Sequence, residues 1–245
     1  MKKFLLMLTS GIILCSCSSP KNLLKSLSNH RFSLDYPYNS EIIDCDQKVK
    51  IAIGAAKFDS FSALTNVSKV KRSAYPFIFI NTFSEEFWIN LGQSSLEESF
   101  SDFFVTSFFR ESRRTGCYEI VDNPKDADYV VDFILKDVKT ESVYKIHDLV
   151  IFLGCYYLTN HRESGSKANT SMEIQLRLIG ESGRWEKTYM LEKEMPLYGN
   201  NYHDIDGLRY NFMENMAESL SITTQECIEM IIKDINLNIL YKKAE

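Results

Sequence analysis

The spacing of apolar residues along the chain predicts a series of half-buried β-strands. Apolar and polar residues alternate in KVKIAIGAA (48–56), ADYVVDFILKDV (127–138) and SMEIQLRLI (171–179). Such alternation places every second side chain on one face, as expected of a strand with one buried side. Gly180-Glu181-Ser182-Gly183, after the third segment, predicts a hairpin turn into a looser return strand that ends at Pro196.

Two segments have the period of amphipathic helices. The first carries an apolar stripe of Leu96, Phe100, Phe103, Phe104 and Phe108. Ser94 and Ser95 precede this stripe as candidate N-caps, and Gly116 follows it as a candidate left-handed stop. We expect the phenylalanines to be buried against a sheet. A second stripe over 208–239 predicts a C-terminal helical region with a break near Thr223.

Two apolar runs do not alternate: YPFIFINTF (75–83) and the run at 148–158, of which LVIFLGCYYL is uncharged. Continuous apolarity is typical of central strands that are covered on both faces. It is also typical of an exposed surface that docks on a partner or a bilayer. Both interpretations stay open. The second run is the better candidate for exposure, with Phe152, Tyr156 and Tyr157 as possible partner-binding residues.

Together these elements predict an α/β (α+β) fold in one domain, residues 47–245. We expect a mixed or antiparallel sheet of five to seven strands with helices packed on one face. The polar segments 57–74 and 160–170 are predicted loops. Residues 17–46 are rich in Ser, Asn and Asp and have no clear period, which predicts a flexible tether that also carries the anchor.

The first residues have the pattern of a secretory signal. A basic pair precedes an apolar run at 4–14 that is too short to span a bilayer, which takes about 20 residues. The run ends in Leu14-Cys15-Ser16-Cys17, where a plain signal would end in small residues such as Ala-x-Ala.

The Leu14–Cys17 segment resembles the lipobox of bacterial lipoproteins. This resemblance implies that residues 1–16 are a signal peptide and that Cys17 is the lipidated residue, carrying palmitate among its acyl chains. Several acyl chains on one residue give firm membrane anchoring. No Asp follows Cys17 directly, so the resemblance implies the outer membrane, with the domain facing the periplasm.

Composition and charge are those of an ordinary globular protein. Apolar residues make up 44% of the chain and charged residues 25%. The formal net charge is −5, and loss of Lys2 and Lys3 with the signal makes it −7. An acidic protein is a poor ligand for nucleic acid, so we expect no nucleic-acid partner.

Four cysteines remain beyond the signal and the anchor: Cys45, Cys117, Cys155 and Cys227. An even number in an oxidising compartment allows two disulfides, in three connectivities. Free cysteine also packs as a small apolar residue, so buried thiols are the alternative.

The sequence contains none of the motifs GxSxG, Walker A, GxGxxG or HExxH, and its four histidines stand at unrelated spacings. We therefore expect no catalytic residue, no metal ligand and no cofactor, and a protein that is not an enzyme. Asp126 and Asp128 stand at a strand entrance, where acids commonly cap turns.

The αββ unit ending in ADYVVDFILKDV and the hairpin MEIQLRLIGESGRWEK, together with the lipobox, resemble auxiliary lipoproteins of envelope ABC transporters and curli-secretion-type lipoproteins. The resemblance covers residues 95–240. It implies a non-catalytic binding or scaffolding module, accessory to envelope transport or assembly, with an envelope protein as its partner. The alternatives are a subunit of an oligomeric secretion pore and a periplasmic enzyme without a recognisable motif.

Overall fold

The computed structural model describes residues 20–38, 49–57, 61–76, 79–153, 156–181, 183–196 and 205–242. The helices in this part are α2 (Pro20–Leu27), α3 (Phe100–Thr115) and α4 (Ile205–Lys242). The strands are β1 (Val49–Lys57), β2 (Asn66–Pro76), β3 (Ile80–Asn90), β4 (Tyr118–Val121), β5 (Tyr129–Leu153), β6 (Tyr156–Gly165), β7 (Ala168–Gly180) and β8 (Gly183–Met195). Short 3-10 turns lie at Gln93–Ser95 and Pro124–Asp126.

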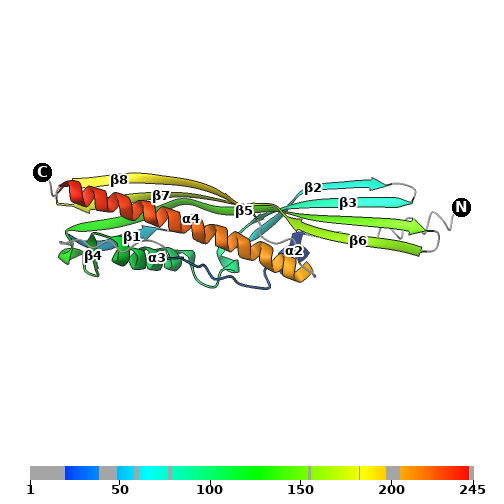
Figure 1. The fold of residues 1–245 in the computed structure, drawn as a ribbon, viewed down its shortest axis with the longest axis horizontal. Helices are drawn as coiled ribbons and strands as arrows, with labels where there is room; N and C mark the ends of the chain where they lie inside the picture. Colours follow the sequence, from blue (N-terminus) through cyan, green and yellow to red (C-terminus); the bar gives the residue numbers. More distant parts are fainter. Residues whose placement is uncertain are drawn as a thin grey trace.

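All eight strands form one mixed sheet, in which β5 is the continuous element (Figure 1). The first half of β5 lies between β1 and β7, and its second half lies between β3 and β6. Strand β1 is parallel to β4 and β5, whereas the other pairs are antiparallel. The predicted α+β class with a mixed sheet is confirmed. The predicted five to seven strands were too few, because segments interpreted as loops are strands.

The sheet divides into two regions along β5. The body contains β1, β4, β7, β8 and the first half of β5, covered by α3 and α4. The arm contains β2, β3, β6 and residues 141–153 of β5, and its strands continue past the ends of the helices (Figure 1). The side of the sheet that α4 covers is the helix side, and the opposite side is the back face.

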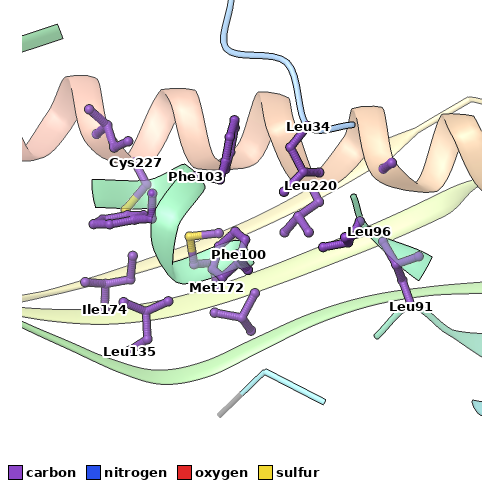
Figure 2. Packing of buried hydrophobic residues seen from close by; sticks show 14 of the residues in the cluster. Leu34, Leu91, Leu96, Phe100, Phe103, Leu135, Met172, Ile174, Leu220 and Cys227 are labelled. Carbon is purple, nitrogen blue, oxygen red and sulfur yellow. The ribbon is translucent and has the colours of Figure 1, made fainter. Parts of the chain in front are cut away.

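The core lies between the helix side of the body and the two long helices. The predicted alternation in β7 is confirmed, because the residues at 172, 174, 176 and 178 are all buried. The predicted phenylalanine stripe is also confirmed: Phe100, Phe103, Phe104 and Phe108 are buried in the same cluster. Figure 2 shows Phe100 and Phe103 among the packed side chains.

Both ends of α3 differ from the prediction. The helix begins later than expected, and its N-cap is Ser99, whose hydroxyl accepts a hydrogen bond from the backbone N–H of Asp102 at 3.0 Å. Ser95 is instead buried beside Thr65, with 2.7 Å between the two hydroxyl oxygens. Gly116 ends the helix with φ −80°, so it does not supply a left-handed stop.

Helix α4 continues without a break for 38 residues. The hydroxyls of Thr223 and Thr224 donate to the carbonyls of Ser219 and Leu220 in the preceding turn, each at 2.8 Å. Because these hydroxyls are satisfied inside the helix, Thr223 does not cap a second helix.

The predicted flexible tether is wrong for residues 20–38. Their buried side chains are Leu23, Leu27, Phe32, Leu34 and Tyr36. The backbone of Phe32 pairs with the residues on either side of Leu96. Its N–H donates to the carbonyl of Ser95 at 2.9 Å, and its carbonyl accepts from the N–H of Glu97 at 3.0 Å. After α2 the segment is an extended strap across the helices, which explains why it shows no regular period. The rest of the predicted tether lies outside the described residues.

The two predicted loops are largely strands. Residues 66–74 belong to β2, and residues 160–165 and 168–170 belong to β6 and β7. In β2 and β6 the polar sequence misled the prediction because these arm strands face solvent on the back face, where polar residues are tolerated.

The four cysteines do not form two disulfides as the prediction allowed. Cys227 is a free, buried thiol on α4, and burial raises its pKa to about 12. The disulfide prediction is wrong for this residue, which packs as an apolar side chain. Cys117 is disulfide-bonded. Cys45 and Cys155 lie outside the described residues.

Candidate functional site

Among the described residues, several of the most exposed large apolar side chains lie on the arm. Its strands lie in the order β2-β3-β5-β6 and are all antiparallel. The register places Tyr75, Thr82, Leu149 and Asn160 in one row across the four strands. Paired residues share a face, so the rows alternate between the helix side and the back face. Because Tyr144, on the helix side, is fully buried in the core, the row of Leu149 faces the back.

The back face of the arm ends in a cluster of exposed apolar side chains, here named the apolar tip. It consists of Tyr75 (63% exposed), Ile80 (42%), Leu153 (56%), Tyr156 (75%) and Leu158 (58%). Phe79, 59% exposed, adjoins the tip just before β3. The described residues around the tip, 73–76, 79–84, 149–153 and 156–160, include no charged side chain. Contiguous exposed apolar surface of this kind marks interaction sites.

A band of basic residues crosses the same face nearer the body. This cationic belt consists of Lys71, Lys145 and Arg162, on three of the four arm strands. Glu86 lies in the same row as Lys71 and Lys145, and its Oε1 is 3.4 Å from Nζ of Lys145. Between belt and tip is a shallow groove of about 450 Å³, lined by residues that include Tyr75 and Arg162.

On the helix side, a buried glutamate connects the arm to α4. The carboxylate of Glu163, on β6, accepts two hydrogen bonds from the guanidinium of Arg209, at 2.8 and 2.5 Å. It also accepts a hydrogen bond from the hydroxyl of Tyr144 at 2.5 Å. Arg209 donates in addition to Ser26 of α2 at 2.8 Å. The base of the arm is therefore connected to two helices through one fully buried carboxylate.

His161 extends this network toward the tip. Its ring nitrogens lie 2.6 Å from Asp148 and 2.8 Å from Glu163. Burial alone would raise the pKa of Glu163, but its hydrogen bonds from Arg209, Tyr144 and His161 outweigh burial and lower the pKa. Burial alone would lower the pKa of His161, and the hydrogen bonds to Asp148 and Glu163 instead raise it.

The structure places two of the three predicted partner-binding residues, on opposite sides of the arm. Tyr156 lies in the apolar tip. Phe152 is half-buried on the opposite side of the arm, because it pairs with Tyr157 in a helix-side row. The side chain of Tyr157 lies outside the described residues, as does Cys17.

Sequence reasoning missed most of the apolar tip. Its other members are Tyr75, Ile80, Leu153 and Leu158. The two uncharged runs contained all of them. The missing information was that each run crosses a hairpin end: 75–83 joins β2 to β3, and 148–158 joins β5 to β6.

Other candidate chemistry is sparse. A groove of about 610 Å³ between the strap and α4 is lined by four acids, Asp35, Glu97, Glu214 and Glu218, among other residues. Within the described ranges, no group of three or more His, Cys, Asp or Glu side chains is placed to hold a metal ion. None of the helices in that part of the chain has both the length and the hydropathy needed to cross a membrane.

No family model matches the chain, and no curated protein matches its sequence. Among solved structures, it is similar to the Xanthomonas campestris protein XCC0632, described by the family model DUF330. The superposition covers 84% of this chain and 97% of that protein, with 9% sequence identity and a TM-score of 0.41. A similarity at this level carries no argument about function.

Proposed function

We propose that this chain is a lipid-anchored envelope lipoprotein that acts as a non-catalytic binding module, with the apolar tip as its docking surface. The observation that carries the proposal is the tip itself. Five large apolar side chains from all four arm strands are exposed together, in surroundings without charge. The proposed location is the outer membrane, facing the periplasm, and its support is the lipobox-like Leu14–Cys17.

The hydrogen-bonded network at the base of the arm supports a structural role for its ionisable side chains. Glu163 bonds to both Arg209 and His161, and its side chain has no solvent exposure. A carboxylate whose oxygens are occupied by Arg209 and Tyr144 is poorly placed to exchange protons with a substrate. These residues instead hold the arm against α2 and α4.

A subunit of an oligomeric secretion pore is the second candidate, and the edges of the arm favour it. Within the described residues, β2 pairs only with β3, and β6 only with β5. Strand β2 runs toward the tip and β6 runs away from it, so these edges in neighbouring copies would pair antiparallel. Against this stand Lys71 and Pro76 on β2, since charges and proline commonly protect edges from pairing.

The anchor is tested by the Cys17→Ser variant. We expect an unprocessed precursor that incorporates no labelled palmitate, because the acylated thiol is gone. Cys15→Ser is the matched control and should keep both processing and label. Continued labelling of Cys17→Ser would assign the lipid to another residue.

The docking surface is tested by photo-cross-linking in native envelopes. A photoreactive amino acid at Tyr156 should give adducts, because this side chain is 75% exposed at the tip. The control position is Met190 of β8, which is 74% exposed on the back face of the body. Equal adduct yields at the two positions would contradict the proposal. Adducts with a second copy of the chain would favour the pore subunit.

A further inference from the structure

The charges around the apolar tip identify what it docks on. We propose that the tip and the cationic belt together bind the surface of an anionic phospholipid bilayer. In this arrangement the tip side chains reach the acyl boundary, and Lys71, Lys145 and Arg162 lie at the level of the lipid phosphates. The inference rests on the proposed docking function of the tip and names its partner.

Charge complementarity is the first argument. The chain as a whole has a net charge of −5, yet the back face of the arm carries three cations against two acids, Glu86 in the belt and Glu141 at the end next to the body. Basic residues beside an apolar surface are attracted to anionic leaflets. On the same face of the body, Asp137 and Glu173 are paired with Lys139 and Lys136, so these residues add no excess of positive charge. Attraction to an anionic leaflet is therefore strongest at the arm.

The dimensions of the apolar surface are the second argument. On β5 the back-face apolar residues run from Leu149 to Leu153, which is about 13 Å of strand. This length is well short of the ~30 Å hydrocarbon core, so the apolar surface is suited to contact with one leaflet and not to crossing the bilayer. Tyrosines at positions 75 and 156 suit the boundary between acyl chains and headgroups.

Backbone hydrogen bonding sets the orientation. Unpaired backbone groups at the outer edges of β2 and β6 are costly inside hydrocarbon. An oblique approach with the back face toward the bilayer inserts side chains only and leaves both edges hydrated. Tip and belt lie on this one face, so the same approach brings both into contact with the lipid.

The test uses the full-length lipidated protein in vesicles, with tryptophan as a reporter of depth. Tyr156→Trp is reconstituted in phosphatidylcholine vesicles with or without phosphatidylglycerol, and quenching by brominated lipid is measured. The native Trp88 and Trp185 signals are subtracted with the unsubstituted protein. We expect at least twofold stronger quenching in the anionic vesicles. Met190→Trp, on the body, should show little quenching in either.

The belt is tested in the same background. Adding Lys71→Glu and Arg162→Glu to Tyr156→Trp should abolish the dependence on phosphatidylglycerol. Quenching that is equal in both vesicle types, or unchanged by the belt substitutions, would overturn the assignment to anionic lipid. Leu158→Trp serves as a second reporter at the tip if Tyr156→Trp lowers the thermal midpoint.

The two proposals fail in distinguishable ways. If Trp at 156 is quenched no more than Trp at 190 while Tyr156 still cross-links to a protein in envelopes, the bilayer inference is wrong. In that case the docking function stands, with a protein as its partner. If position 156 shows neither lipid quenching nor photo-cross-linking above the control position, the docking function is wrong as well.

Discussion

Phe104→Ala should lower the free energy of unfolding by about 3–5 kcal/mol, because it removes a fully buried ring and leaves a cavity. The ring of Phe104 lies 5.5 Å from that of Phe133, centroid to centroid, and 6.5 Å from that of Phe100. It therefore packs α3 directly against β5. The measurement is urea unfolding monitored by circular dichroism.

The matched control is Phe109→Ala on the same helix. Phe109 is only half-buried and its ring faces the guanidinium of Arg113 at 4.7 Å. We expect Phe109→Ala to lower the free energy of unfolding by clearly less than Phe104→Ala does. Equal unfolding midpoints for Phe104→Ala and the unsubstituted protein would show that α3 does not pack on the sheet as described.

Glu163→Gln should lower the free energy of unfolding by about 3 kcal/mol. This value is at the lower end of the range for breaking a buried ion pair, because Arg209 keeps some solvent exposure. The amide preserves the shape of the side chain but leaves the guanidinium without its carboxylate. We expect earlier unfolding in urea and faster hydrogen exchange at the base of the arm. The control is Glu194→Gln, whose exposed pair with Lys167 should contribute about 0–1 kcal/mol.

The effect of Glu163→Gln should depend on pH with a definite sign. The folded-state pKa of Glu163 lies below its ordinary value, so its ionised form stabilises the fold above about pH 4.3. The stability gap between the unsubstituted protein and Glu163→Gln should be full at pH 7 and shrink as pH falls through the folded pKa. A gap that widens on acidification would show that Glu163 is not held ionised by Arg209.

The body of the fold was largely predictable because the apolar residues of each of its main elements repeat with a single period. Alternation in β7 and the stripe on α3 both reflect burial on a single face, which leaves a regular record in the sequence. The break predicted in α4 was wrong because Thr223 can satisfy its hydroxyl within a helix as well as at a cap. The strap at 31–38 has no period because it is extended and crosses other elements.

The arm and its tip were predictable only in part. The uncharged runs indicated unusual surfaces, and Tyr156 was predicted as a possible partner-binding residue. Which residues share a face depended on the positions of two hairpin ends and on the pairing of β3 with β5, which are tertiary facts. A shift of one residue reverses the face of every side chain, which is why the sequence grouped Phe152 with Tyr156 although the two lie on opposite sides of the arm.

Strand β5 has a mechanical consequence. Its 25 residues extend over about 80 Å, from the core beside β1 to the end of the arm. Ladder hydrogen bonds between antiparallel strands lie perpendicular to the strands, so a pull along the arm loads the bonds of β5 to β7 in shear, many at once. A sideways pull on the outermost strands would instead separate their bonds one after another. The molecule should therefore resist axial tension at the tip far better than lateral tension, and single-molecule pulling along the two directions would measure the difference.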